Sequence, residues 1–420
     1  MRYVNPSTLD GTIAVPPSKS LMQRATAAAF LSPQTTEIVN ASSCDDARHA
    51  LRLIEDLGAE VRRAGPDLSG DRVLIRGGAA PERGRVQCGE SGLCLRMFTP
   101  ILSLFKGPIV LEAQGSLLHR PVDMMERPLA DLGAPCETNG GRPPVTVRGP
   151  LRGGRAEVDG SVSSQFLSGL LLALPLAGER SEIVVKNLRS RSYLEMTLAV
   201  IRAFGGVVER SPDLSAFRIP GRQAYRAREF RVEGDWSGAA VLLTAGALAG
   251  RVEISGLSPD SLQPDRAVLQ ALEAAGAKIR VSEERILAER ADLRPFSFDI
   301  GECPDLFPPL AALAARCEGT STIRGIERLL HKESARDSAI REEFSKIGVR
   351  VDISDGAARI RGGPIRGGQA ESHGDHRIAM ALALAGLVSE SGVGISGSSC
   401  VAKSYPDFFE DLGRLGGRIT

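Results

Sequence analysis

The sequence predicts an α/β protein of two lobes, each made of three copies of a unit of about 70 residues. Three observations predict this fold class. The chain has 420 residues, which is too long for a single compact core. Six strongly apolar segments recur along the chain, and six amphipathic segments that end in glycine alternate with them. Both series keep an interval of 68–75 residues, so each unit combines an apolar helix, an amphipathic helix and several strands.

The apolar segments are predicted to be buried helices, because a helix that is apolar on all faces belongs in a core. They begin near residues 18, 90, 163, 235, 304 and 374, as SKSLMQRATAAAF, ESGLCLRMFTPIL, SSQFLSGLLLAL, DWSGAAVLLTAG, PDLFPPLAALAA and GDHRIAMALALAG. Polar or charged residues stand at nearly all of their N-termini. Two explanations apply: simple N-capping by Ser or Asp, or N-termini that converge and bind an anion through their free N–H groups.

The amphipathic segments are predicted to be surface helices that end at a glycine and lead into a short strand. The glycines are Gly58, Gly133, Gly205, Gly276, Gly348 and Gly416. A helix commonly ends with a residue at positive φ, where glycine alone avoids strain. We therefore expect these six glycines to be helix C-terminal residues in equivalent places of the six units.

Composition excludes several function classes. The formal net charge is +1, which argues against a general nucleic-acid or membrane-surface binder. The seven cysteines are scattered without a CxxC pair, as is typical of reduced thiols in a cytoplasmic protein. The N-terminus does not read as a signal peptide, and the most apolar run, FLSGLLLALPLAG, is too short to span a bilayer. We expect a soluble cytoplasmic protein.

Common catalytic motifs do not match. The chain has neither GxGxxG after a strand nor GxxxxGK[ST], and it lacks a GxSxG nucleophile elbow. His373 and His376 stand close together in HGDH, but no further His or Cys completes a metal site, so we expect a structural role and no metal.

Seven basic residues resist a purely structural explanation: Lys19, Arg24, Arg120, Lys332, Arg336, Arg377 and Lys403. Each alone could be a solvated surface charge, but a cluster would suit a doubly anionic small molecule. In HKESAR, a helix would place Lys332 and Arg336 on one face. Asp305 in CPDLF and Glu333 in HKESAR are candidate proton-transfer groups beside such a cluster.

The chain resembles the 5-enolpyruvylshikimate-3-phosphate synthases (3-phosphoshikimate 1-carboxyvinyltransferases) of the enolpyruvyl transferase family over essentially its full length. The motifs that carry the resemblance are PSKSLMQR, DGSVSSQF, RSRSYLEMT, CPDLF, HKESAR, DHRIAM and AKSYPDFF, in the family's order and spacing. The resemblance implies a two-lobed inverse α/β barrel of six βαβαββ-like repeats with buried parallel helices. One lobe would contain residues 1–17 and 233–420, the other residues 18–232, with the substrate cleft between them.

The resemblance also implies the reaction. The enolpyruvyl group of phosphoenolpyruvate is transferred to the 5-hydroxyl of shikimate 3-phosphate through a tetrahedral intermediate, and phosphate is released. This step of the shikimate pathway leads to chorismate and the aromatic amino acids, and glyphosate inhibits it at the phosphoenolpyruvate site. No cofactor or metal is implied, and the partners are the two small substrates of a monomeric enzyme.

Site residues follow from the resemblance, motif by motif. Catalytic roles fall on Asp305 as base, Glu333 as acid, and Lys19. Shikimate 3-phosphate would be bound by Lys19, Ser20, Arg24, Ser163, Ser164, Gln165, Ser190, Asp305 and Lys332. Phosphoenolpyruvate would be bound by Lys19, Gly92, Arg120, Gln165, Arg336, Arg377 and Lys403.

One stretch departs from the family pattern. GESGL has Glu90 and Leu93 where the family usually has an amide and a hydroxyl, although Gly92 is kept. We expect Gly92→Ala to weaken glyphosate more than phosphoenolpyruvate. Arg328 stands where the family uses a different side chain, and it receives no role.

Two alternative functions remain open from the sequence. The first is the sister enolpyruvyl transferase that acts on UDP-N-acetylglucosamine, which has a different lysine context and a cysteine on a cleft loop. The second is a non-catalytic anion-binding relative, in which Asp305 or Glu333 would be expected to be lost.

Overall fold

The computed structural model describes residues 1–64, 71–78, 84–161 and 163–420. Two compact units are formed within this part of the chain. Unit 1 consists of Met1–Pro16 and Glu233–Thr420, and unit 2 consists of Pro17–Val232. Each unit has its own hydrophobic core and is described separately below.

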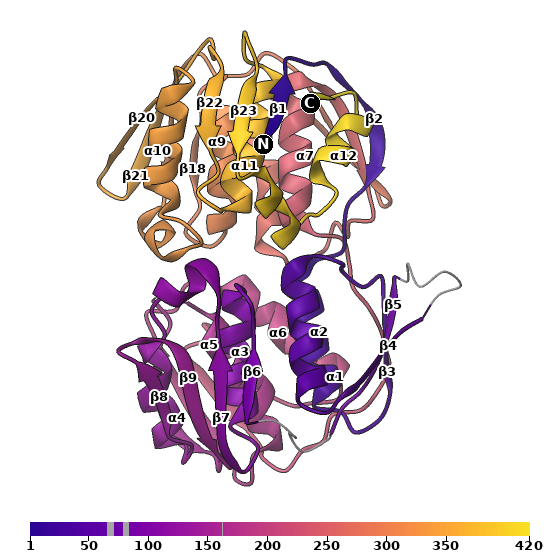
Figure 1. The fold of residues 1–420 in the computed structure, drawn as a ribbon, viewed down its shortest axis with the longest axis vertical. Coiled ribbons are helices and arrows are strands. Elements are labelled where there is room, and N and C mark those ends of the chain that lie inside the picture. Colours follow the sequence, from indigo (N-terminus) through magenta and orange to yellow (C-terminus); the bar gives the residue numbers. More distant parts are fainter. Residues whose placement is uncertain (65–70, 79–83, 162) are drawn as a thin grey trace. The chain divides into compact units, whose positions relative to one another are not determined.

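Three buried helices form the centre of unit 2. They are α1 (Lys19–Phe30), α3 (Gly92–Leu102) and α5 (Gln165–Ala173), and almost all of their residues are buried. Helix α3 packs against both α1 and α5 (Figure 1). Three amphipathic helices accompany them: α2 (Asp45–Asp56), α4 (Glu126–Asp131) and α6 (Arg191–Ala203).

Three four-stranded sheets belong to unit 2. In spatial order, the first contains β14 (Glu229–Arg231), β3 (Thr36–Val39), β5 (Arg72–Arg76) and β4 (Glu60–Ala64). The second contains β6 (Arg85–Gln87), β7 (Gly107–Glu112), β9 (Arg142–Gly149) and β8 (Cys136–Asn139). The third contains β10 (Gly154–Asp159), β11 (Ser181–Lys186), β13 (Ala216–Ile219) and β12 (Glu209–Arg210).

Unit 1 repeats this plan. Its mutually packed buried helices are α7 (Trp236–Ala249), α9 (Phe307–Ala314) and α11 (His376–Leu387) (Figure 1). Its amphipathic helices are α8 (Val268–Ala274), α10 (Arg336–Lys346) and α12 (Phe408–Arg414). The expected alternation of apolar and amphipathic helices is therefore confirmed in both units.

Three four-stranded sheets also belong to unit 1. The first contains β16 (Lys278–Val281), β17 (Arg285–Glu289), β15 (Gly250–Ser255) and β2 (Leu9–Ala14). The second contains β18 (Ser297–Asp299), β19 (Gly319–Arg324), β21 (Ala357–Gly362) and β20 (Arg350–Ser354). The third contains β22 (Gly368–Glu371), β23 (Val393–Ser396), β1 (Arg2–Asn5) and β24 (Arg418–Ile419).

All six sheets share one pattern of strand pairing. In each sheet one edge strand pairs in parallel with the strand that follows a buried helix, and two further strands add in antiparallel order, as in β18, β19, β21 and β20. In four of the sheets that edge strand is the one that precedes the same helix (β6, β10, β18 and β22). This is the expected βαβαββ unit, in open sheets that do not close into a barrel within the described residues. Three sheets are completed by remote strands: β1 pairs with β23, β2 with β15, and β14 with β3.

The six repeat glycines have the predicted conformation. Their φ angles are +88°, +82°, +83°, +90°, +90° and +104° at Gly58, Gly133, Gly205, Gly276, Gly348 and Gly416. A side chain at such φ values is strained, so glycine ends the amphipathic helix in every unit.

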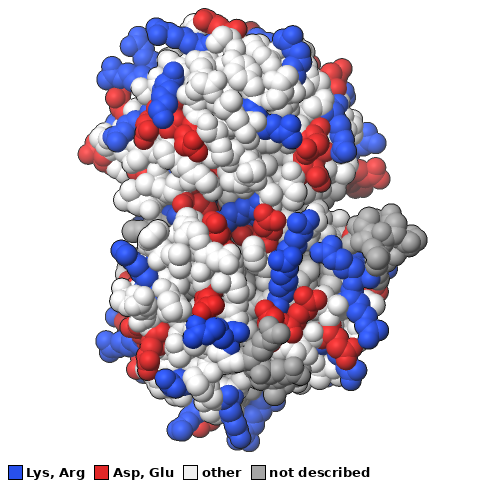
Figure 2. All heavy atoms as spheres, viewed as in Figure 1, with Lys and Arg blue, Asp and Glu red and all other residues white. Residues whose placement is uncertain are grey.

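The surface agrees with the balanced composition. Figure 2 shows basic and acidic side chains interspersed over the drawn face of each unit, without one continuous basic field. None of the helices in the described residues has the length and apolarity needed to cross a membrane.

Short 3₁₀ helices connect many strands to the following amphipathic helix. In unit 2 these are η1 (Gly115–His119) and η2 (Asp123–Met125), and η3 (Leu174–Leu176) extends α5. In unit 1 they are η4 (Pro264–Ala267), η6 (Glu327–His331) and η7 (Ser398–Lys403), whereas η5 (Pro304–Leu306) precedes α9. These loops and the N-termini of the buried helices carry most of the candidate site residues.

Candidate active site

Side chains cap four of the six buried helices. Ser18 accepts a hydrogen bond from Leu21 N, Ser91 from Cys94 N, Asp235 from Gly238 N, and Asp375 from Arg377 N. N-capping therefore explains these four polar residues. Helices α5 and α9 have no side-chain cap, so the polar residues at their N-termini need another explanation.

In unit 1, Asp305 lies at the centre of three cations. Its carboxylate is 2.7 Å from Arg336 Nη1, 3.3 Å from Lys332 Nζ and 3.3 Å from Arg377 Nη2. Burial alone would raise the pKa of Asp305, but the charges of the three cations outweigh burial and hold the pKa well below its usual value. The carboxylate is therefore ionised across the working pH range.

Arg336 joins three carboxylates in the same network. Its side chain is 1% exposed. It donates to Asp375 Oδ2 at 2.8 Å, to Glu333 Oε2 at 2.6 Å and to Asp305. Burial lowers the pKa of Arg336, but the charges of Asp375, Glu333 and Asp305 raise it well above its usual value. Sequence-predicted residues from three segments of unit 1 thus meet at one guanidinium.

The predicted helical placement of Lys332 and Arg336 on one face is wrong. Lys332 follows η6 in an extended conformation, and α10 begins only at Arg336. The hydroxyl of Ser334 donates to Asp375 Oδ2 at 3.0 Å, which ties the intervening turn to the start of α11. The two cations still meet, because both bind Asp305.

Lys403 is the last predicted unit 1 residue. It ends η7, and its side chain is largely buried. It therefore lies in the same kind of loop as Lys332, between the second strand of a repeat and its amphipathic helix.

In unit 2, Arg24 is a buried cation held by neutral oxygens. Its side chain donates to Thr197 Oγ1 at 2.9 Å, to Ser20 O at 2.8 Å and to Tyr193 O at 3.3 Å. Thr197 is held in turn by Ser168 Oγ at 2.9 Å. Within the described residues no carboxylate forms an ion pair with Arg24. Burial lowers the pKa of Arg24 to about 10, so a bound anion would stabilise its charge.

Lys19 has a carboxylate partner that the sequence reasoning missed. Its Nζ is 3.1 Å from Oδ2 of the buried Asp46, in the first turn of α2. Asp46 lies at the start of an amphipathic helix, and Lys332 and Lys403 lie shortly before one, so its place in the repeat was the available signal. Ser190, at the start of α6, occupies the same place in its repeat and adopts a left-handed conformation with φ of +57°.

Gln165 is linked to a second residue that sequence reasoning missed, Arg96. Arg96 Nη1 donates to Gln165 Oε1 at 3.0 Å, and Arg96 is 1% exposed. Gln165 N in turn donates to Ser163 Oγ at 3.2 Å. Ser163 therefore lies at the N-terminus of α5, next to Ser164, the N-cap residue of this helix. Val162, in the same motif, lies outside the described residues.

Gly92 lies against the guanidinium of Arg120. A Cβ atom at position 92 would be 2.7 Å from Arg120 Nη1 and 3.1 Å from Arg96 Nη1. Arg120 is largely buried and follows η1. A side chain at position 92 would therefore have to displace the guanidinium of Arg120.

The residues that depart from the family pattern are packed inside unit 2. The Glu90 carboxylate lies directly over Gly115, so that a Cβ atom at position 115 would overlap it. Gly115 also has a φ of +54°. Glu90 is therefore turned toward the start of η1. Leu93 is 8% exposed and belongs to the core.

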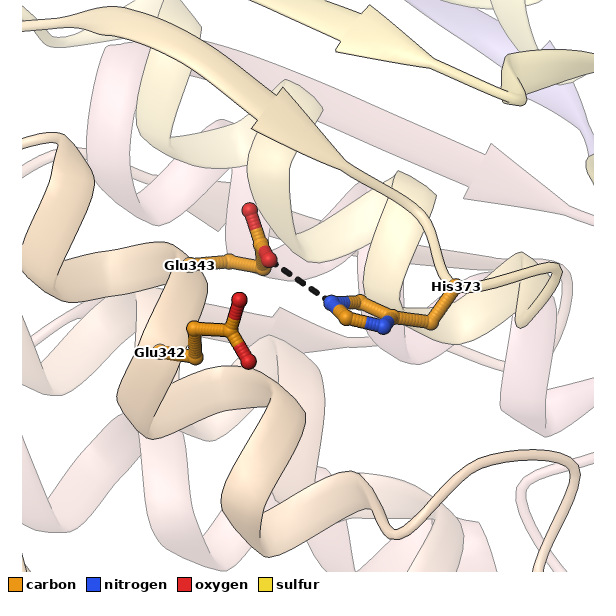
Figure 3. Close-up of side chains that lie close together, drawn as sticks. All are labelled: Glu342, Glu343 and His373. Carbon is orange, nitrogen blue, oxygen red and sulfur yellow. Dashed lines mark hydrogen bonds and ion pairs between the residues drawn. The ribbon is translucent and has the colours of Figure 1, made fainter.

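A group of possible metal ligands in unit 1 already contains a cation. Oxygen or nitrogen atoms of Glu342, Glu343 and His373 lie within 4.8 Å of one another (Figure 3). Lys346 Nζ is 2.7 Å from Glu343 Oε1 and 3.2 Å from Glu342 Oε1. Because the ammonium group already occupies the space between the two carboxylates and offsets part of their charge, we interpret the group as structural. It ties α10 to the loop before α11, where Glu343 bonds His373 at 2.6 Å.

Comparison with known proteins covers the whole chain. A family model described as EPSP synthase (3-phosphoshikimate 1-carboxyvinyltransferase) matches residues 4–412. A curated 3-phosphoshikimate 1-carboxyvinyltransferase of Aeropyrum pernix is 39% identical, over 99% of this chain and 96% of the relative. One of Methanoculleus marisnigri is 36% identical over 98% of each chain.

Solved structures show the same fold. An EPSP synthase from Acinetobacter baumannii matches with a TM-score of 0.82 at 26% identity, over 100% of this chain and 99% of the other. The enolpyruvyl transferase NikO from Streptomyces tendae, at 19% identity and a TM-score of 0.79, shares the fold.

Proposed function

The chain belongs to the EPSP synthase family of 3-phosphoshikimate 1-carboxyvinyltransferases, and on that premise we propose which of its residues carry out the reaction. The enolpyruvyl group of phosphoenolpyruvate is transferred to the 5-hydroxyl of shikimate 3-phosphate, and phosphate is released. The observation that carries the assignment of roles is the network around Asp305, where two carboxylates that can move protons share a buried arginine.

Asp305 is the base and Glu333 the acid in this proposal. Addition needs two proton transfers: the 5-hydroxyl loses its proton as its oxygen attacks C2, and C3 gains a proton to become a methyl group. The resulting tetrahedral intermediate then loses a proton from C3 and expels phosphate. General acid–base catalysis of such steps contributes about 10²–10⁴-fold.

Substrate binding makes both carboxylates suitable for these roles. Without substrate, three cations keep the pKa of Asp305 low, and a carboxylate with a low pKa is a weak base. Phosphoenolpyruvate would bring its own negative charges to Arg336 and Arg377. The cations then stabilise the Asp305 carboxylate less and its pKa rises, and Arg336 stabilises the Glu333 carboxylate less for the same reason.

The remaining predicted residues bind the two substrates. Shikimate 3-phosphate is bound by Lys19, Ser20, Arg24, Ser163, Ser164, Gln165, Ser190 and Lys332, together with Asp305. Phosphoenolpyruvate is bound by Lys19, Gly92, Arg120, Gln165, Arg336, Arg377 and Lys403. The buried Arg24, without a carboxylate among the described residues, supports the first set. Lys19 also acts in catalysis, because its ammonium group stabilises the charge that develops on the departing phosphate.

We propose a monomeric cytoplasmic enzyme to which both units contribute substrate-binding residues. All seven cysteines are free, in agreement with a reducing compartment. Among the described residues, the large exposed apolar side chains come from six different segments: Met1, Leu118, Val207, Leu262, Val281 and Leu330.

The assignment is tested by phosphate release from the purified protein. We expect phosphate only when shikimate 3-phosphate and phosphoenolpyruvate are both present, and the same rate after addition of a chelator. Omission of either substrate and the variant Asp305→Asn serve as controls. Phosphate release with UDP-N-acetylglucosamine in place of shikimate 3-phosphate would support the sister activity instead.

A further inference from the structure

Asp265 is a buried carboxylate in unit 1 for which neither the motifs nor the proposed mechanism provides a role. It lies in η4 and is 2% exposed. Its Oδ2 accepts a hydrogen bond from Ser237 Oγ, in the first turn of α7. Its Oδ1 is also buried and has no hydrogen-bond partner among the described residues.

Arg377 has the complementary feature. Its Nη2 pairs with Asp305, but its Nε is buried and has no hydrogen-bond partner in the described part of the chain. Asp265 and Arg377 are close enough for each charge to shift the pKa of the other. The structure thus holds an unused buried acceptor and an unused buried donor on two neighbouring, oppositely charged side chains.

The repeat gives independent support. The segment between the second strand of a repeat and its amphipathic helix supplies Arg120, Ser190, Lys332 and Lys403 in four of the other repeats, and Asp46 lies in the first turn of the amphipathic helix in the fifth. Asp265 occupies this segment in the remaining repeat, between β15 and α8. In the other five repeats this part of the chain supplies a proposed substrate-binding residue or the partner of one. Asp265 is their counterpart by its place in the fold, not by a fixed spacing from the repeat glycine.

A purely structural role does not explain the charge. An asparagine would accept the hydrogen bond from Ser237 equally well. Burial and the nearby Asp305 raise the pKa of Asp265 to about 6, while Arg377 and Ser237 lower it. Asp265 is therefore charged at neutral pH, but its ionisation costs more in the folded protein than in an ordinary aspartate. A charged residue kept at such a cost to stability is typical of functional sites.

We propose that Asp265 is a positioning residue that, together with Asp305, holds the guanidinium of Arg377 between two carboxylates. The proposal rests on the proposed function. When Asp305 takes up the proton of the 5-hydroxyl, its ion pair with Arg377 is lost. Asp265 remains charged and keeps Arg377 in place toward phosphoenolpyruvate.

Asp265→Asn separates this role from a structural one. It preserves volume and the acceptor for Ser237 but removes the charge. We expect kcat/KM for phosphoenolpyruvate to fall about 10- to 100-fold, and KM for shikimate 3-phosphate to stay within about twofold. The exposed Asp260, in the preceding loop, provides the matched control Asp260→Asn, which should match the wild type.

The stability of Asp265→Asn should not fall together with its activity. Because the pKa of Asp265 is raised on folding, its contribution is present below the unfolded pKa and is lost as pH rises through about 6. The melting temperature of Asp265→Asn at pH 7.5 should therefore equal or exceed that of the wild type. Lower stability together with lower activity would indicate a merely structural residue and overturn the proposal.

The pH profile gives the second readout. The charged groups that face Asp265 are Asp305, Arg377 and Asp235, and the Cys303 thiol is also nearby. The ratio of wild-type to variant kcat/KM should shrink as pH falls through about 6, where Asp265 takes up a proton. A ratio near one at all pH values, with an active wild type, would overturn this proposal alone. An inactive wild type would contradict the proposed function, while the stability measurement would still test the charge at Asp265.

Discussion

Buried cations are compensated differently in the two units. In unit 1, Arg336 donates to the carboxylates of Asp305, Glu333 and Asp375. In unit 2, Arg24 is equally buried but donates to a hydroxyl and two carbonyl oxygens. Neutral oxygens orient a guanidinium without cancelling its charge, whereas carboxylates cancel it.

The difference indicates a division of labour. Unit 1 contains groups that can exchange protons and cationic partners when an anion arrives, as acid–base chemistry requires. In unit 2, Lys19 is paired with Asp46, but Arg24 keeps its positive charge in a fixed place, an arrangement suited to recognition of a phosphate. Substitutions in unit 1 and in unit 2 test this difference.

The largest effect is expected for Asp305→Asn. We expect kcat to fall about 10²–10⁴-fold while the dissociation constants of both substrates change much less, because the proton transfer matters mainly in the transition state. Phosphate release and equilibrium binding measure the two quantities. The exposed Asp352→Asn is the control. Near-normal turnover of Asp305→Asn would remove it as the base.

Stability should distinguish the two buried arginines. Arg336→Met leaves three carboxylates without their shared cation and should lower the free energy of unfolding by about 3–5 kcal/mol. Arg24→Met removes a buried charge without a carboxylate partner and should be neutral or stabilising. Chemical denaturation of both variants measures the difference, and equal losses would contradict the comparison.

Binding should respond to Arg24 in the opposite way. Arg24→Met should weaken shikimate 3-phosphate about 10- to 100-fold, since hydrogen bonds to charged groups contribute about 1.5–3 kcal/mol. Calorimetric titration measures the affinity, and Arg24→Lys, which keeps the charge, should lose less. Unchanged affinity in Arg24→Met would show that the phosphate binds elsewhere.

Gly92→Ala tests how unit 2 supports its cations. The added methyl group would meet Arg120 Nη1 at 2.7 Å, so the guanidinium must move. We now expect about a tenfold rise in KM for phosphoenolpyruvate, in addition to weaker inhibition by glyphosate, because Arg120 is a proposed ligand of phosphoenolpyruvate. Inhibition curves at matched substrate saturation measure both. If only the affinity for glyphosate fell, the result would agree with the expectation from the sequence, in which Gly92→Ala weakens glyphosate more than phosphoenolpyruvate.

The smallest effect is expected for Glu343→Gln. Burial raises the pKa of Glu343, but hydrogen bonds from Lys346, Glu371 N and His373 together hold it below the usual value. Its contribution to stability is therefore present above the unfolded pKa and is lost as pH falls through the folded one. We expect a loss of about 1 kcal/mol at pH 7 that shrinks toward pH 4, and the same melting temperature with or without added Zn²⁺.

Much of the fold could be predicted because its signals are local. Glycines with positive φ, serine and aspartate caps and fully apolar helices each depend on a few consecutive residues. The exchange of β1, β2 and β14 among the sheets could not be derived from the repeat alone, because strand pairing is settled between segments up to about 400 residues apart. The family resemblance supplied the discontinuous lobes.

The site shows the same limit. The cations could be selected as candidates from the sequence, since a lysine or arginine beside a buried apolar helix is conspicuous there. Their partners were not: Asp46, Arg96 and Thr197 look ordinary in their own segments. The turn between Lys332 and Arg336 was also mistaken for a helix, because its conformation depends on a bond to the remote Asp375.

Residue type and spacing were therefore sufficient to predict the repeated unit and its helices, and to select the charged residues that are candidates for the site. Tertiary packing alone decided which charges are cancelled and which stay available, as in Arg336 with its carboxylates and Arg24 without them. The physical reason is that the free energy of a buried charge depends on the atoms around it, and those atoms come from segments that only the folded chain brings together.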